Sequence, residues 1–219
     1  MSEIDTILPS VDGTVGVKVV GADISDDLFL SFVDGKVVAL DIETTGLSWE
    51  HDDIATCQLY RPNGIAVIVR IQKERPPINL AKLIASQNVK KIFHHAVFDL
   101  RFMAAHWKCD IKNISCTKVA SKILNDNPIG SHSLKDILNY HLGIGIPKGY
   151  ARSDWFSHEL SQNQLQYAVD DVIYLPSLLA ALQSRLEEKA RWDQALASFE
   201  YLPTRVKLDI QGIGDVFTY

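Results

Sequence analysis

Two carboxylates stand at the end of an apolar run in the N-terminal third of the chain. Asp41 and Glu43 belong to Val37-Val38-Ala39-Leu40-Asp41-Ile42-Glu43, a run typical of a strand that is buried on both faces. Residues two apart on a strand project from the same face, so these carboxylates should lie side by side. Burying such a pair is costly, and a divalent cation that prefers oxygen ligands, such as Mg²⁺ or Mn²⁺, removes the cost. The alternative is that both side chains point into solvent.

Two further acids occupy comparable positions. Asp99 follows a short expected strand at 90–94 and falls in the first turn of the next helix, where capping of the helix dipole is the alternative role. Tyr167 and Asp171 are four residues apart on an expected helix and therefore share one face. A Tyr-x-x-x-Asp pair alone is common on helices. Only the combination with the other acids predicts a metal site.

The remaining pattern predicts the elements that position these residues. Strands are expected at 15–20 (an edge strand), 37–43, 54–60, 64–70 and 90–94, with a hairpin signal at Asn63-Gly64. Helices are expected at 25–33, 78–85, 97–106, 115–124, 133–142, 161–175 and 177–200. Ser161 and Gln164 form a capping-box signature, and Pro176 should kink or divide the final helical stretch. This order predicts an α/β three-layer fold in which a mixed sheet is flanked by helices, with a helical C-terminal part.

The composition indicates an ordinary globular domain. The chain has 219 residues, of which 47% are hydrophobic and 22% charged, enough for one well-packed core. No apolar run approaches the roughly 20 residues that span a bilayer, so we expect no membrane association. The three cysteines match no common zinc or disulfide pattern, which favours buried thiols in a reducing compartment. The cytoplasm is therefore the expected location.

The distribution of charge is uneven. The net charge of −5 argues against tracking along a long nucleic acid, because such binding depends on phosphate neutralisation. Residues 88–152, however, carry ten Lys/Arg and four Asp, a balance of +6 against −11 for the remainder. Cations opposite an acidic site would suit a polyanion held by few contacts. Solvated helix faces explain the same pattern equally well, so charge does not decide the function.

Three segments resemble the motifs of the DEDD superfamily of 3′→5′ exonucleases: ALDIETTGL (39–47), IFHHAVFDL (92–100) and YAVDDVIYL (167–175). Tyr167, four residues before the last Asp, resembles the tyrosine (DEDDy) branch, whereas the histidine branch has its base at the position of Gln166. SHSLKDIL (131–138) and IPKGYARSDW (146–155) are similar to features of ribonuclease D-like catalytic domains. Two departures from typical ribonuclease D are similar to nano-RNase C. Cys116-Thr117 replaces an Asp-Thr pair, and the sequence ends with one helix and a short tail.

The resemblance implies a ribonuclease H-like fold. Residues 1–219 would form a single 3′→5′ exonuclease domain, with a core at about 35–190 and a C-terminal helix and tail at about 191–219. Asp41, Glu43, Asp99 and Asp171 would hold two divalent cations, Mg²⁺ or Mn²⁺, and Tyr167 would orient the attacking water. Substrates would be short RNA oligonucleotides (diribonucleotides), or DNA, with a free 3′ end, and products would be 5′-mononucleotides. A homo-oligomer is also implied.

Four residues are candidates for contacts with the substrate. Leu47 resembles an apolar wedge that packs against terminal bases, and an ordinary buried leucine is the alternative. Lys148 and Arg152 are candidates for phosphate contacts, although solvated loop charges would look the same. His94 is a further substrate-binding candidate, for which packing or hydrogen bonding beside the site is favoured over direct ligation.

Three other functions remain open. The first is a broader ribonuclease D-like exonuclease that acts on longer RNA 3′ ends or on DNA. The second is an inactive exonuclease-like binding module, which is disfavoured because all four acids are present. The third is a metallophosphatase or other carboxylate-metal hydrolase, which would leave the Tyr-x-x-x-Asp helix without a role.

Overall fold

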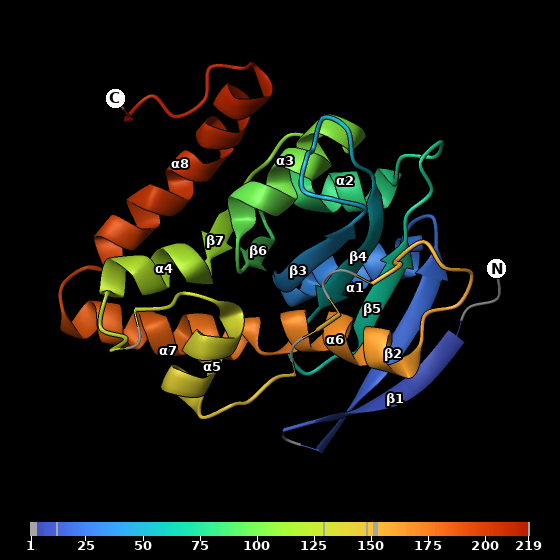
Figure 1. Ribbon diagram of the computed structural model, residues 1–219, viewed down its shortest axis with the longest axis horizontal. Helices are drawn as coiled ribbons and strands as arrows, with labels where there is room; N and C mark the ends of the chain where they lie inside the picture. Colours follow the sequence, from blue (N-terminus) through green and yellow to red (C-terminus); the bar gives the residue numbers. More distant parts are fainter. Residues whose placement is uncertain (1–3, 12, 129, 148, 151–152, 219) are drawn as a thin grey trace.

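A seven-stranded mixed sheet forms the centre of the computed structural model, which describes residues 4–218 except 12, 129, 148 and 151–152 (Figure 1). The strands are β1 (Ile4–Ser10), β2 (Gly13–Gly21), β3 (Val37–Thr44), β4 (Ile54–Tyr60), β5 (Ala66–Arg70), β6 (Lys90–Phe93) and β7 (Ile114–Cys116). Their order in the sheet is β1-β2-β5-β4-β3-β6-β7. β3, β4 and β5 are antiparallel neighbours, whereas β6 and β7 run parallel to β3. The carboxyl ends of β3 and β6 therefore meet at one edge of the sheet.

Helices flank this sheet. They are α1 (Asp26–Gly35), α2 (Ile78–Ala85), α3 (Ala96–Trp107), α4 (Thr117–Leu124), α5 (Leu134–Leu142), α6 (Gln162–Ile173), α7 (Leu175–Glu188) and α8 (Trp192–Ile210). α1 and α2 pack against each other, while α6 crosses the sheet and contacts β3, β4 and β5. α7 continues along β3 and β6, and α8 lies against α3 and β7. The expected three-layer α/β architecture with a helical C-terminal part is confirmed.

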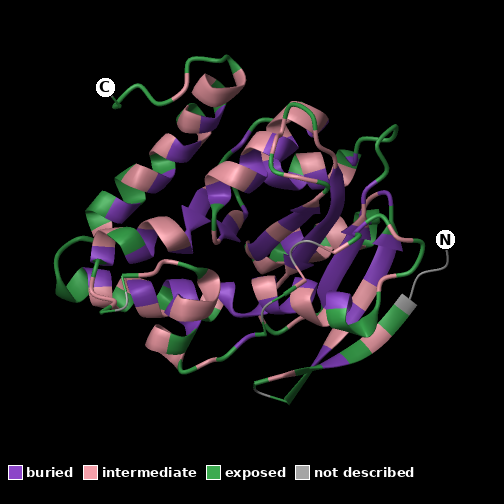
Figure 2. Cartoon of the chain, in the orientation of Figure 1, coloured by how far each residue is buried: buried purple, intermediate pink, exposed green. Residues whose placement is uncertain are grey.

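The strands at the centre of the sheet are buried almost throughout, as Figure 2 shows. Val38, Leu40 and Leu59 are fully buried, as are Val67 and Ile68 on β5. This burial on both faces explains why the run before Asp41 contains no polar residue. The expected hairpin at 54–70 and the capping box of α6 are likewise present.

Two expectations about the ends of the sheet were wrong. β2 is an interior strand, because β1 pairs with it in antiparallel register and takes the edge. β1 was missed because it is an edge strand with one exposed face, on which Ile7 is 71% exposed. The helix expected at 115–124 begins only at Thr117, since Ile114–Cys116 pair with β6 as β7. A three-residue strand is too short for its periodicity to be distinguished from the start of a helix.

The C-terminal helices also differ from the expectation. Pro176 does mark a division, lying in the first turn of α7. The helix expected at 177–200 ends at Glu188, however, and Ala190 adopts a left-handed conformation (φ 52°) before α8 starts at Trp192. α8 then includes Pro203 and continues through most of the expected tail, to Ile210. Neither Gly nor Pro occurs at 189–191, so the sequence contains no local signal for this break.

The stretch Gln162–Glu188 is, within the described part of the chain, long and apolar enough by composition to cross a membrane. Its most apolar window is 61% buried inside the protein, because α6 and α7 pack against the sheet. The same stretch carries Tyr167 and Asp171. These helices therefore form the layer that brings the last acid to the strands.

Candidate active site

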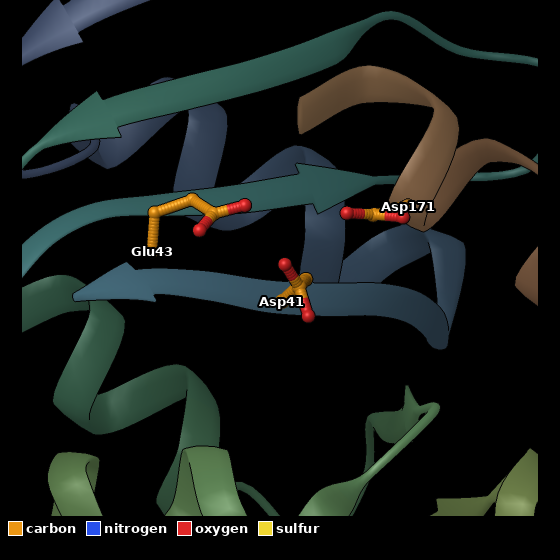
Figure 3. A group of neighbouring side chains, drawn as sticks. All are labelled: Asp41, Glu43 and Asp171. Atoms are coloured by element: carbon orange, nitrogen blue, oxygen red, sulfur yellow. The ribbon is translucent and has the colours of Figure 1, made fainter. Parts of the chain in front are cut away.

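Three of the four acids come together at the edge of the sheet where β3 ends. Asp41 and Glu43 project from β3 toward Asp171 of α6, as Figure 3 shows. One carboxylate oxygen from each of the three lies within 4.8 Å of the other two. The ladder between β3 and β4 shifts register at Glu43/Thr44, so regular pairing stops beside the cluster. The expected same-face arrangement of Asp41 and Glu43 is present.

Asp99 lies beside this cluster in the first turn of α3. Its side chain is 2% exposed, and Oδ1 accepts a hydrogen bond of 3.2 Å from the backbone N–H of Ile42, between the two β3 acids. It does not belong to the group within 4.8 Å, and its expected role in holding a cation stays a prediction. Burial, and then the negative charge of Asp99, nevertheless raise the pKa of Asp41.

Burial and mutual repulsion dominate the electrostatics of the four acids. Burial, followed by neighbouring carboxylates, raises the pKa of Glu43 to about 10 and holds the pKa of Asp41 and Asp171 well above the usual range. Burial also raises the pKa of Asp99 to about 7. None of the four forms an ion pair with a lysine or arginine among the described residues. This set of oxygen donors therefore fits a divalent cation of the Mg²⁺ or Mn²⁺ type, which would favour the ionised carboxylates.

Tyr167 lies one helical turn before Asp171 and donates a hydrogen bond to it, which offsets a small part of the rise in the pKa of Asp171 caused by burial and by the neighbouring carboxylates. Burial, and then the charges of Asp171 and Glu43, raise the pKa of the phenol above its ordinary value. The Tyr167 ring lies 6.3 Å from that of Tyr150 and 6.1 Å from that of Trp155, measured between centroids. Trp155 is buried in the core. A neutral phenol held in this way can orient a water molecule but is a poor base.

Leu47 stands in solvent, on the loop that follows β3. It is 85% exposed, so the alternative of an ordinary buried leucine is wrong. The Asp52 carboxylate folds into the loop, where it accepts hydrogen bonds from Ser48 N (2.9 Å) and Thr45 Oγ1 (3.3 Å). A Cβ on Gly46 would lie 2.4 Å from Asp52 Oδ2. Sequence reasoning missed the close contact of Gly46 with Asp52, although Gly and a nearby Asp after a strand are ordinary loop signals.

His94 has partners within the protein for both ring nitrogens. Nδ1 lies 3.0 Å from Thr117 Oγ1, and Nε2 lies 3.1 Å from the carbonyl oxygen of His132. Burial, and then the charge of Lys118, lower the pKa of His94 to about 3, so the ring is neutral. This geometry favours the packing role, and a substrate contact of His94 stays a prediction. Lys148 and Arg152 lie outside the described residues.

Comparison with known proteins gives one family and several relatives. A family profile described as 3′-5′ exonuclease matches residues 18–187. Ribonuclease D of Haemophilus influenzae is 30% identical over 163 residues, which cover 74% of this chain and 39% of the relative. DNA polymerase I of Aquifex aeolicus is 33% identical over 151 residues, covering 68% of this chain and 24% of the relative. The chain thus spans less than half the length of these curated relatives.

Solved structures agree over a larger share of the chain. NrnC of Brucella melitensis bound to pGG has a TM-score of 0.85 and 35% identity, covering 93% of this chain and 98% of that one. NrnC with bound Mg²⁺ has a TM-score of 0.84 at the same identity. The catalytic core of RRP6 from Trypanosoma brucei, at 21% identity and a TM-score of 0.74, shares the fold.

Proposed function

Because the chain belongs to the 3′-5′ exonuclease family, as a ribonuclease D-like member with a ribonuclease H-like fold close to that of NrnC, we propose that it acts on short RNA. The proposed substrates are oligonucleotides with a free 3′ end, diribonucleotides above all, and the products are 5′-mononucleotides. The observation that carries this proposal is the convergence of Asp41, Glu43 and Asp171 in a chain that spans 98% of NrnC, a protein whose structure contains pGG.

Asp41, Glu43 and Asp171 are the proposed ligands of one divalent cation, Mg²⁺ or Mn²⁺, and Asp99 the main ligand of a second. Support comes from the carboxylate oxygens of Asp41, Glu43 and Asp171, which lie within 4.8 Å of one another. The four acids also form no ion pair with a described lysine or arginine, and the NrnC structure contains bound Mg²⁺. Such a cation pair supplies electrostatic stabilisation of the scissile phosphate and of the departing 3′ oxygen, and makes water more acidic. The chain's part is to hold four carboxylates in place against their mutual repulsion.

The remaining roles fall on side chains around the acids. Tyr167 is proposed to orient the attacking water, because its hydroxyl is neutral and fixed by Asp171. Leu47 is proposed to pack against a base of the substrate, since an exposed leucine on the loop after β3 is available for such a contact. Lys148 and Arg152 remain candidates for phosphate contacts.

A homo-oligomer in the cytoplasm completes the proposal. The last described residues carry exposed apolar side chains, with Phe217 77% and Ile213 57% exposed, which supports a contact with a second copy. Light scattering coupled to size-exclusion chromatography measures the mass of the particle. A monomer at every concentration would contradict this part alone.

Digestion of labelled substrates tests the activity. Purified protein with Mg²⁺ is given a 5′-labelled diribonucleotide, a long single-stranded RNA and a duplex DNA, and the products are identified. We expect 5′-mononucleotides and the fastest turnover on the diribonucleotide, with Asp41→Asn as the inactive control. Faster turnover of the long RNA or of DNA would favour the broader ribonuclease D-like function, which the similarity to ribonuclease D supports. Absence of hydrolysis with either Mg²⁺ or Mn²⁺ would favour an inactive binding module.

A further inference from the structure

Two polar side chains lie opposite the acids on the neighbouring strand. In the antiparallel ladder between β3 and β4, Gln58 is the direct partner of Asp41, and Thr56 is the direct partner of Glu43. Directly opposed residues share a face of the sheet, with Cβ atoms roughly 4.5–5.5 Å apart. Gln58 and Thr56 are both fully buried. They therefore form part of the floor of the candidate active site.

The Gln58 carboxamide is held at one end only. Its Nε2 donates a hydrogen bond of 2.8 Å to Thr56 Oγ1, which draws the carboxamide along β4 toward the level of Glu43. Its Oε1 has no hydrogen-bond partner among the described residues. A buried acceptor without a donor is destabilising, and a native structure that keeps one calls for an explanation.

Once a divalent cation holds the neighbouring acids in their ionised form, they do not satisfy this oxygen, because ionised carboxylates are acceptors only. A hydrated divalent cation does offer suitable donors. Mg²⁺ usually keeps several of its waters when it binds to protein carboxylates, and each of these waters has protons to donate. The partners of metal sites commonly lie one layer behind the ligands and fix the orientation of whatever the metal holds.

We infer that Gln58, held by Thr56, is a positioning residue of the metal site, and that its Oε1 accepts a hydrogen bond from a water of the bound cation. The inference rests on the proposed function, in that it presumes a divalent cation at Asp41, Glu43 and Asp171. Gln58 would then be a neutral residue of a metal site whose other proposed residues are acids. The orphaned acceptor and the repelling carboxylates would then be satisfied by the same ion.

Binding of Mg²⁺ alone, without substrate, tests this role. Gln58→Leu keeps a similar volume and removes both polar atoms. We expect its Mg²⁺ affinity, measured by calorimetric titration, to fall by about 10-fold to 100-fold, the usual effect of losing such a partner. The rise in Tm on adding Mg²⁺ should shrink, whereas the metal-free Tm should stay the same or increase. Gln58→Met serves if the leucine variant does not fold, and Thr56→Val should show a smaller loss of affinity.

Gln164→Leu is the matched control. Gln164 is also a buried glutamine, but both ends of its carboxamide have partners, Ser161 N at 3.0 Å and the Asp154 carbonyl oxygen at 3.1 Å. Its loss should lower the metal-free Tm and leave Mg²⁺ affinity unchanged. If Gln58→Leu or Gln58→Met binds Mg²⁺ as the wild type does, Gln58 has no such role. If the wild type itself binds neither Mg²⁺ nor Mn²⁺, the metal site of the proposed function is overturned, and this inference with it.

Discussion

Largely buried acids occur in two regions of the protein, and the two regions differ in whether a basic side chain pairs with the acid. In the helical C-terminal part, Asp126 lies 2.6 Å from Arg185 and 3.5 Å from Lys189, although its side chain is only 12% exposed. Asp209, 8% exposed, lies 3.0 Å from Arg205 and also faces Arg101 at 3.7 Å. At the edge of the sheet, four acids of comparable burial have no such cation among the described residues.

This difference supports a metal-binding role for the four acids at the edge of the sheet. Where an acid serves the fold, the protein supplies the opposite charge itself, and Arg101 and Arg185 come from helices that are distant in sequence from the acids they face. Where carboxylates are gathered without a basic side chain, repulsion and desolvation are left uncompensated. An external cation is then part of the stable state. The contrast supports the metal site more strongly than the acids considered alone.

Replacing a proposed ligand should have the largest effect. We expect Asp41→Asn and Asp171→Asn each to lower turnover of a diribonucleotide by on the order of 10³-fold, because metal ligation stabilises the transition state by several kcal/mol. The metal-free Tm should stay the same or rise, since one repelling charge is removed. Steady-state rates and thermal melts in EDTA measure both quantities. Retention of more than about a tenth of the activity would contradict the assignment.

Tyr167→Phe separates orientation from metal binding. Turnover should fall by about 10-fold to 100-fold, the range expected when a reacting group is misplaced. Mg²⁺ affinity should change far less than in Asp41→Asn, because the phenol is not a ligand. Calorimetric titration alongside steady-state kinetics gives the two numbers. An equal loss of affinity in the two variants would show that Tyr167 belongs to the metal site itself.

Asp126→Asn tests the other half of the comparison. It should lower the free energy of unfolding by roughly 1–2 kcal/mol, a value discounted because Arg185 and Lys189 are 37% and 41% exposed. Turnover should be unaffected. Denaturant unfolding measures the loss, with Glu188→Gln, an exposed acid of α7, as the control. A fall in activity without loss of stability would erase the distinction between the two regions.

The pH dependence of the metal-free protein should be the smallest effect. Carboxyl groups titrate near pH 4 when unfolded, whereas burial raises the pKa of Asp99 to about 7 and of Glu43 to about 10. Because these folded-state pKa values are raised, protonation favours the folded state, and stability is lost as pH rises through them. We expect Tm in EDTA to fall by a few degrees between about pH 5 and pH 8. Saturating Mg²⁺ should remove much of this slope, and Asp171→Asn should reduce it; equal slopes in all three samples would contradict the pKa shifts.

Much of this arrangement could be predicted from local pattern. The apolar run before Asp41, the Asn-Gly hairpin and the Ser161 capping box are each encoded within a few residues, and each is present. The pairing of Gln58 with Asp41 is different, because it depends on the register of two strands. Polar residues at alternate positions of an otherwise apolar strand were visible in IATCQLY, but only the register shows what they face.

The misses have a common physical origin. β1 and β7 are stabilised by the strands beside them, so their own residues carry little of the signal. The turn at 189–191 depends on a left-handed alanine, which no local preference favours. Leu47 could be proposed as a wedge by resemblance, yet its exposure depends on how the following loop is held.

That loop ties two positions to each other. The space into which the Asp52 carboxylate folds exists only because residue 46 has no side chain. In any related chain that keeps the same loop shape, an alanine at position 46 would have to be matched by a residue other than aspartate at position 52. Positions 46 and 52 should therefore vary together among relatives. Such covariation would indicate that the loop shape, and with it the exposed position of Leu47, is kept.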